Sequence, residues 1–304
     1  MTREPVPVAP PPGRQGPGAI PRRLIEALDL VVARRAAGPL SGDRRAAGIG
    51  AGTELAQLRP YEVGDDVRQI DASATARTGE PYVRLHVPER TLTTWIVFDR
   101  SPSMAFGTAS RLKYDVAEGA AIVVSRLAVR RAGRVALLAF GAGPVVLKPP
   151  RASKPGMVAV ERAVREGVGS DGVADRSGLQ HALVRTGKVA TQPGLVVVIS
   201  DFRDQDEWAR SLGALRARHS VLAIEVRDPR EAVLPAAGRL ALVDPETGDR
   251  LTVDTSRRAV REKFAEIEAA GRAAVASELW RLRVGHVVLF TQGDWLRDLG
   301  RRLA

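Results

Sequence analysis

The chain has 304 residues, 44% of them hydrophobic, and is therefore long and apolar enough to bury a full core. It contains no cysteine, which excludes disulfides, thiolate zinc sites and cysteine nucleophiles, and its four scattered histidines argue against a zinc enzyme. The net charge of +11 raises the question of nucleic-acid binding, but the arginines are spread along the whole chain and aromatic residues amount to only 4%. We therefore expect a generally basic surface rather than a nucleic-acid interface.

The beginning of the chain predicts an N-terminal extension in two parts. Residues 1–18 are rich in proline and glycine, which predicts a disordered arm. Residues 19–90 contain an expected helix from about Pro21 to Gly38, a glycine-rich linkage and a dense polar segment. No apolar run approaches the length of a membrane span and the start does not read as a signal peptide, so we expect a cytoplasmic protein without a membrane span.

From residue 91 to residue 304, apolar strands alternate with amphipathic helices. Strands are expected at 94–98, 134–140, 144–147, 195–199, 221–226, 239–243, 250–253 and 285–290, and helices at about 111–130, 155–166, 178–187, 208–215, 257–280 and from 294. Two of the strand pairs are separated by turn residues that predict hairpins, the first of them at a sheet edge. The predicted fold class is therefore α/β, with a doubly wound, mostly parallel sheet and helices on both faces.

The strand at 94–98 is followed by three oxygen-bearing side chains, Asp99, Ser101 and Ser103. Carboxylate and hydroxyl oxygens without histidine or cysteine suit a hard cation such as Mg²⁺, Mn²⁺ or Ca²⁺. Asp201 follows the strand at 195–199, which we expect to neighbour the first strand, so that both carboxylates lie at one sheet edge. The competing interpretation is local: Asp99 and the serines bond their own backbone in a turn, and Asp201 caps a helix.

The Asp-x-Ser-x-Ser pattern after a buried strand resembles the metal-ion-dependent adhesion site of von Willebrand factor A domains. The resemblance asks for one more hydroxyl on a loop between the two strands, and Ser177 is the best match. It implies that Ser101, Ser103 and Ser177 bind the cation directly, while Asp99 and Asp201 hold it partly through waters. It also implies that the cation recruits a carboxylate from another protein as its last ligand.

Three arginines flank this predicted site: Arg100, Arg176 and Arg203. Arg176 stands where the von Willebrand pattern has a glycine. Positive charge so close to a cation site would weaken cation binding or replace the cation.

A second resemblance lies upstream of the sheet. Residues 54–61 read Glu-Leu-Ala-Gln-Leu-Arg-Pro-Tyr, residues 64–71 read Gly-Asp-Asp-Val-Arg-Gln-Ile-Asp, and an Ala-Arg pair follows at 76–77. These motifs are similar to those of the bacterial family called domain of unknown function fifty-eight, although Leu55 and Ala72 stand where the family has aromatic residues. The resemblance covers about residues 20–300. It implies a von Willebrand A-like domain after the motifs and an adaptor that works with a MoxR-type AAA+ ATPase.

The role of four charged residues in that segment can be interpreted in two ways. They are Asp65, Asp66, Arg68 and Asp71. Gly64 permits a turn, so these charges together with Arg77 could form a buried ion-pair network. Alternatively, they form a surface to which a partner docks. The structural interpretation is favoured, and the docking surface stays open.

Together the patterns predict a non-enzymatic adaptor that binds proteins through Mg²⁺ or a similar cation. Its expected partners are a MoxR-type AAA+ ATPase and client proteins in maturation or assembly. The chain has no Gly-x-x-x-x-Gly-Lys-Ser/Thr loop, so ATP hydrolysis would come from the partner. The rival hypothesis is a metal-assisted hydrolase or phosphotransferase that uses Asp99, and nucleic-acid binding is a third alternative.

Overall fold

The computed structural model describes residues 15–21, 23, 25, 54–87, 92–108, 111–130, 132–141, 143–169, 178–203 and 208–303. These residues form two compact units, a smaller one within residues 40–91 and a larger one from the rest of the chain. Most of the helix expected from Pro21 to Gly38, and residues 1–14 of the expected arm, lie outside the described residues. No helix in the described part of the chain is both long and apolar enough to cross a membrane.

The smaller unit is a two-stranded antiparallel sheet with a short helix. Strand β1 (Glu54–Pro60) pairs with β2 (Tyr82–Val87) so that Glu54 lies opposite Val87. Between the strands lie the 3-10 turn η1 (Val67–Gln69) and helix α2 (Ala72–Thr78). Gly64 precedes η1 with a φ of 114°, a backbone conformation that favours glycine, so it forms the turn expected of it.

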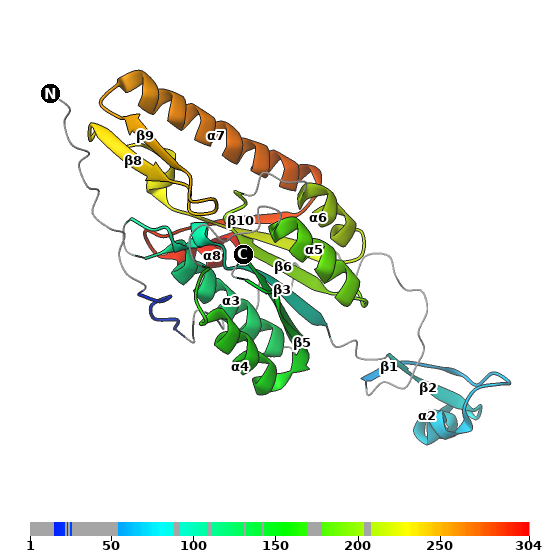
Figure 1. Cartoon of the computed structure of the whole chain (residues 1–304). Helices are drawn as coiled ribbons and strands as arrows, with labels where there is room; N and C mark the ends of the chain where they lie inside the picture. The colour runs from blue at the N-terminus through cyan, green and yellow to red at the C-terminus, as the bar shows by residue number, and fades with distance from the viewer. Residues whose placement is uncertain are drawn as a thin grey trace. The chain divides into compact units, whose positions relative to one another are not determined.

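The larger unit is built on a six-stranded sheet with the strand order β10-β7-β6-β3-β4-β5 (Figure 1). The strands are β3 (Thr93–Asp99), β4 (Arg134–Phe140), β5 (Val146–Ala152), β6 (Leu195–Ser200), β7 (Ser220–Arg227) and β10 (Gly285–Phe290). All pairs are parallel except β4 with β5, which is the predicted edge hairpin. The predicted α/β fold class is therefore confirmed, as is the neighbouring position of β3 and β6.

Helices cover both faces of this sheet (Figure 1). One face carries α3 (Lys113–Arg130), α4 (Ser153–Val164) and α8 (Trp295–Leu303). The other carries α5 (Gly178–Val189), α6 (Trp208–Arg216) and the end of α7 (Arg258–Arg281). Most of α3 is buried, including its first residue, Lys113, so a charged side chain lies inside the larger unit.

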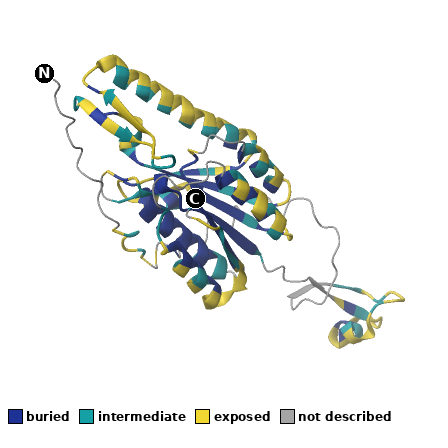
Figure 2. Cartoon of the chain, viewed as in Figure 1, coloured by how far each residue is buried: buried dark blue, intermediate teal, exposed yellow. Residues whose placement is uncertain are grey.

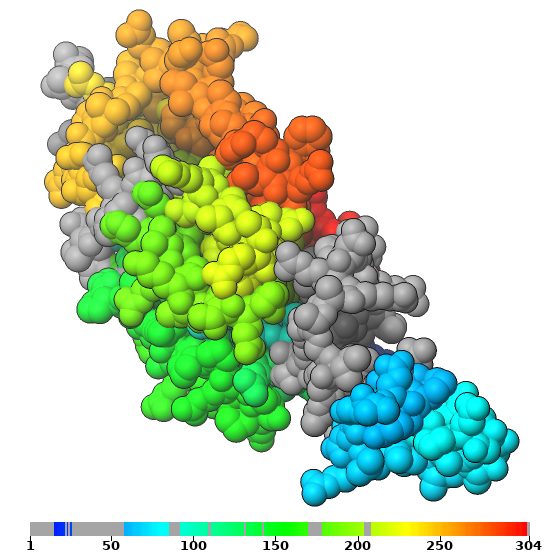
Figure 3. All heavy atoms as spheres, turned by 90° about the vertical axis from the view of Figure 1, so that its right-hand side faces the viewer, coloured from blue at the N-terminus to red at the C-terminus, as the bar shows by residue number. Residues whose placement is uncertain are grey.

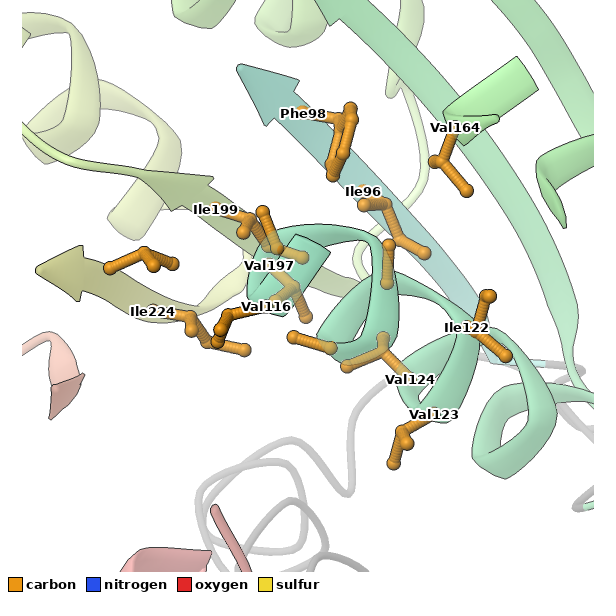
Figure 4. Packing of buried hydrophobic residues seen from close by; sticks show 14 of the residues in the cluster. Ile96, Phe98, Val116, Ile122, Val123, Val124, Val164, Val197, Ile199 and Ile224 are labelled. Atoms are coloured by element: carbon orange, nitrogen blue, oxygen red, sulfur yellow. The ribbon is translucent and has the colours of Figure 1, made fainter. Parts of the chain in front are cut away.

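The main core lies between α3 and the centre of the sheet (Figure 4). Val116 and Val124 of α3 belong to the same buried cluster as Ile96, Val197 and Ile224 of the strands. Every residue of β3 is buried, as expected for the central strand of a parallel sheet that is covered on both faces. The burial of each such aliphatic side chain stabilises the folded state by about 1.5–3 kcal/mol. Because β3 and β6 both contribute side chains to this core, it holds the two strands in place next to each other.

The edge strand β5 is longer than the strand predicted at 144–147, because it continues through Pro149 and Pro150. Proline has no N–H group to donate and therefore interrupts a central strand, but β5 has a neighbour on one side only. An edge position thus tolerates two residues that end a strand in most sequence patterns.

A separate two-stranded sheet, β8 (Arg239–Val243) with β9 (Arg250–Asp254), confirms the second predicted hairpin. It follows the 3-10 turn η3 (Pro229–Ala232) and lies beside the first part of α7 (Figures 1 and 3). Most side chains of this hairpin and of α7 are exposed, in contrast to the sheet (Figure 2). Leu240 and Thr255 at the base of the hairpin are buried, which anchors it to the larger unit.

The described residues before residue 26 lie against the larger unit. The backbone N–H of Gly16 donates to the carboxylate of buried Asp115 at 2.9 Å. The indole N–H of Trp295 in α8 donates to the carbonyl of Pro17 at 3.0 Å, and Ile25 is buried in the main core. The described residues of this segment therefore belong to the larger unit.

Candidate metal and protein-docking site

The ends of β3 and β6 lie side by side because the strands pair in register up to Phe98 and Ile199. Ser200 Oγ donates to Asp99 Oδ2 at 2.6 Å, and the backbone N–H of Ser101 donates to Asp99 Oδ1 at 2.8 Å. Burial of the carboxyl group, and then the negative charge of Asp201, raise the pKa of Asp99 to about 7. Asp99 is therefore a buried acid whose oxygens are oriented by hydrogen bonds and which lies near a second acid, Asp201.

The hydroxyl oxygens of Ser101 and Ser103 are 3.1 Å apart at the 3-10 turn η2 (Pro102–Ala105), which follows Asp99. The backbone of this loop is held by the neighbouring strand β4. Gly141, just after β4, has a φ of 87°, and a Cβ atom there would lie 2.5 Å from the backbone nitrogen of Ser101. Only a glycine lets the end of β4 approach the serine loop so closely.

Asp201 binds a buried ammonium group. Lys113 Nζ donates to Asp201 Oδ2 at 2.6 Å and to Glu231 Oε1 at 2.5 Å, and the lysine side chain is 1% exposed. Burial alone would raise the pKa of Asp201, but the charge and the hydrogen bond of Lys113 outweigh it, so the pKa of Asp201 is lowered. Asp201 Oδ1 also accepts the backbone N–H of Arg203 at 3.1 Å, a local bond of the kind that the competing interpretation expects, while residues 204–207 before α6 lie outside the described residues.

Arg100 pairs with a carboxylate away from Asp201, whereas Arg203 pairs both with Glu268 and with Glu231, the acid that shares Lys113 with Asp201. Arg100 Nη1 donates to Glu166 Oε2 at 2.9 Å, and Arg203 Nη2 donates to Glu268 Oε2 at 2.8 Å. The basic side chain that bonds to the Asp201 carboxylate is instead Lys113. Arg176 and Ser177, the predicted third hydroxyl ligand, both lie outside the described residues.

A network of charges surrounds Asp201 on the side of β7 and α7. Both oxygens of the buried Glu225 carboxylate accept hydrogen bonds from Arg227 at 2.7 Å, and Arg272 Nη1 donates to Glu225 Oε1 at 2.7 Å. Arg272 Nη1 also donates to the carbonyl of Asp201 at 2.7 Å. Burial would raise the pKa of Glu225, but hydrogen bonds from His286 and Arg227 and the charges of both arginines lower it.

One further carboxylate reaches the serine loop from the β8–β9 hairpin. The backbone N–H of Ser103 donates to Glu246 Oε1 at 3.2 Å, although 143 residues separate them in the chain. Burial is the main cause that raises the pKa of Glu246, and the negative charges of Asp201 and Asp244 raise it further. Glu246 therefore lies over the same polar site as Asp99 and Asp201.

The groups at the end of β3 fit a hard divalent cation. In octahedral Mg²⁺ coordination, with ligands at about 2.1 Å, adjacent ligand oxygens lie about 3 Å apart, and this matches the hydroxyls of Ser101 and Ser103. Hydrogen bonds from Ser101 and Ser200 orient the Asp99 carboxylate. A cation bound beside it would balance its negative charge. Within the described residues, no three His, Cys, Asp or Glu side chains gather to hold a metal, so the fit depends on the hydroxyls.

The charged residues predicted in the smaller unit bond mainly to nearby groups. Asp65 Oδ1 accepts a hydrogen bond from Arg59 at 2.6 Å, and Asp66 caps η1 by accepting the backbone N–H of Arg68 at 3.0 Å. Asp71 caps α2 by accepting the N–H of Ala74.

The prediction of one buried ion-pair network in this unit is wrong. Asp71 is buried and pairs with Arg84 at 2.6 Å, but Arg68 and Arg77 are exposed. The physical reason is that an aspartate at the start of a turn or helix bonds the free backbone N–H groups there. The alternative of a docking surface stays a prediction.

Two residues of the site were not found by sequence reasoning. Lys113 lies on the helix face of Val116, Ala120 and Leu127, and a lysine at an apolar position is a signal that its ammonium needs buried acidic partners. Glu246 lies in the turn of the second hairpin, and no local pattern indicates that this turn folds back onto residue 103.

Three similarities in sequence cover different shares of the chain. The model of the family described as "Protein of unknown function DUF58" matches residues 57–274. The uncharacterized protein Rv1480 of Mycobacterium tuberculosis is 35% identical over 282 residues, which is 92% of this chain and 88% of that protein. A protein of Paracoccus denitrificans, called an uncharacterized protein in the moxR 3′ region, is 50% identical over 66 residues, which is 21% of this chain and 62% of that protein.

Solved structures offer distant similarities. The conserved hypothetical protein BatB from Bacteroides thetaiotaomicron is 13% identical, with 70% of this chain and 97% of that chain covered at a TM-score of 0.40. The von Willebrand factor type A structure from Catenulispora acidiphila is 11% identical, with 70% and 42% covered at a TM-score of 0.36. Neither similarity is close enough to bear on function.

The close approach of Gly141 to Ser101 predicts a selective effect of an added methyl group. Gly141→Ala must strain the backbone and push the serine loop away, whereas Gly143→Ala meets only the strain, since no atom lies near its Cβ position. We expect Gly143→Ala to lower the free energy of unfolding by about 1–2 kcal/mol. Gly141→Ala should lower it by about 1–3 kcal/mol more, as measured by urea unfolding. Equal losses would contradict the role given to Gly141.

The buried ammonium of Lys113 predicts a large effect of its removal. Lys113→Met leaves Asp201 and Glu231 without their shared cation and should lower the free energy of unfolding by about 3–5 kcal/mol. The double variant Lys113→Met/Asp201→Asn should recover part of this loss. Lys263→Met, a control at an exposed lysine of α7, should change stability by less than about 0.5 kcal/mol. A loss in Lys113→Met as small as in the control would contradict the ion pair.

The lowered pKa of Glu225 predicts how the effect of its removal depends on pH. Above its ordinary pKa of 4.5 the ionised carboxylate stabilises the folded state, and this contribution is lost as the pH falls through the lower pKa of the folded protein. Glu225→Gln should therefore destabilise the protein by about 3–5 kcal/mol at pH 7, with a gap to wild type that narrows below pH 4.5. The exposed Glu262→Gln is the control. A gap that stays constant down to acid unfolding would refute this account.

Proposed function

The chain belongs to the DUF58 family of proteins of unknown function, and on this premise we propose that it is a non-enzymatic adaptor that binds other proteins through a divalent cation. Asp99, Ser101 and Ser103 hold the cation, with Ser177 as a third hydroxyl and Asp201 as a nearby negative charge. Mg²⁺ bound there would supply an open coordination position for a carboxylate oxygen of another protein.

The observation that carries the proposal is the pair of hydroxyls 3.1 Å apart beside Asp99. Ser200 and the backbone N–H of Ser101 orient the Asp99 carboxylate, while Lys113 neutralises Asp201. Most of the proposed direct ligands are therefore neutral hydroxyls. Such a set leaves the charge of a cation largely unbalanced, which favours a carboxylate as the remaining ligand.

We propose a MoxR-type AAA+ ATPase as the partner, with client proteins whose maturation or assembly it drives. Support comes from the relative in Paracoccus denitrificans, whose name refers to the moxR 3′ region. The sequence has no phosphate-binding loop, so the partner would hydrolyse the ATP. The partnership is proposed for the cytoplasm, because the ATPase needs a supply of ATP.

A hydrolase or phosphotransferase that uses Asp99 has less support. A carboxylate nucleophile needs an oxygen free to attack, whereas both oxygens of Asp99 accept hydrogen bonds, from Ser101 and Ser200. Hydrogen bonds of this kind are what orients a carboxylate beside a metal.

Removal of the Asp99 carboxylate tests the adaptor proposal. Asp99→Ala should weaken capture of a co-expressed MoxR-type ATPase in Mg²⁺ by roughly tenfold or more, which corresponds to about 1.4 kcal/mol. Wild type should lose capture to the same extent in EDTA. Asp298→Ala on the exposed side of α8 is the matched control and should behave as wild type.

Capture that is equal in wild type and Asp99→Ala, with and without EDTA, would contradict the adaptor proposal. The enzyme alternative is tested with the same preparations. Turnover of p-nitrophenyl phosphate by wild type that is lost in Asp99→Ala would favour it.

A further inference from the structure

We propose that the β8–β9 hairpin is a built-in competitor for the site: Glu246 at its tip occupies the position that a partner's carboxylate takes, and a partner must displace it. The inference rests on the proposed function for the identity of the cation. The contact between the hairpin and the serine loop is independent of it.

The contact is specific and long-range. Glu246 Oε1 accepts the backbone N–H of Ser103 at 3.2 Å, at one of the two serines whose hydroxyls are 3.1 Å apart. Glu246 is thus a carboxylate, the group that the site is proposed to recruit, and it already lies at a proposed ligand residue.

The turn of the hairpin presents this glutamate in a defined conformation. Asp244 Oδ1 accepts the backbone N–H of Glu246 at 2.8 Å, and the N–H of Gly248 donates to the carbonyl of Asp244 at 2.8 Å. Thr247 Oγ1 donates to Asp249 Oδ2 at 2.9 Å, which closes the other side of the turn. Because the backbone of the turn is bonded to itself, Glu246 extends from a preformed support.

The hairpin is anchored at its base, and the apolar side chains of its strands are exposed toward the tip. At the base, Leu240 is 3% exposed and Thr255 Oγ1 donates to the carbonyl of Gly238 at 2.8 Å. Toward the tip, Val243 and Leu251 are 51% and 63% exposed. A two-stranded hairpin is marginally stable without further packing, so its tip can leave the site while its base stays in place.

A cation at the contact would account for the charge of Glu246. A neutral side chain could also accept the N–H of Ser103, whereas a carboxylate at this position is repelled by Asp201 and Asp244. A cation between these groups turns that repulsion into attraction. The acidic tip therefore fits a site that holds a cation and selects carboxylates.

The competition has a calculable size. A tethered group acts at an effective concentration in the millimolar range. A partner's apparent affinity is its intrinsic affinity multiplied by the fraction of molecules whose site is free. If the tip occupies the site in about nine molecules of ten, its removal tightens partner binding roughly tenfold.

The hairpin tip itself, supplied as a separate peptide, tests the proposal. The probe is the synthetic peptide Asp-Pro-Glu-Thr-Gly-Asp, which has the sequence of residues 244–249, and its binding is measured by saturation-transfer NMR in Mg²⁺. Glu246→Gln should bind the peptide roughly tenfold more tightly than wild type. The peptide with glutamine in place of glutamate should not bind. The exposed Glu262→Gln removes an equal charge from α7 and should behave as wild type.

The outcomes separate this inference from the proposed function. Equal binding of the peptide to wild type and Glu246→Gln, or binding to neither, overturns the inference. Binding to Glu246→Gln that persists in EDTA and in Glu246→Gln/Asp99→Ala overturns the cation of the proposed function and leaves the competitor in place. Capture of the ATPase gives a second reading, because Glu246→Gln should capture it roughly tenfold more tightly, whereas weaker capture would identify Glu246 as a permanent ligand.

Discussion

The buried ion pair between Lys113 and Asp201 is the interaction on which the arrangement of the site depends. Lys113 is the first residue of α3, Asp201 follows β6, and Glu231 in η3 shares the same ammonium. An unpaired charge at this depth would cost several kcal/mol, so the helix, the strand and the turn must meet with this geometry. The pair also makes the two acids of the site different. The charge of Asp201 is balanced by Lys113, whereas the Asp99 carboxylate bonds only to groups of Ser101 and Ser200 among the hydrogen bonds described above.

The fold and the first part of the site could be predicted because they depend on patterns that are local or periodic. Strand β3 is buried on both faces and reads as an apolar run, so its end at Asp99 is visible in the sequence. The parallel arrangement then brings Asp201 to the same edge. The alternation of strands and helices in the sequence is sufficient to predict that Asp99 and Asp201 lie at the same edge of the sheet.

The remaining parts could not be predicted for two different reasons. The contact of Glu246 with Ser103 joins residues far apart in the chain, and its only trace in the sequence is an acid in a turn. The prediction for the Gly-Asp-Asp segment failed for the opposite reason. Its aspartates were expected in a long-range ion-pair network, but two of them cap η1 and α2 by accepting nearby backbone N–H groups.

The α/β unit is interrupted in the sequence, since it uses residues from both sides of the smaller unit. The described residues of the smaller unit begin and end on paired strands, with Glu54 opposite Val87. The segment between β1 and β2 is thus a closed loop within the smaller unit, and the entropic cost of closing such a loop grows only slowly with its length. Residues can therefore be gained or lost between β1 and β2 during evolution at little cost in stability.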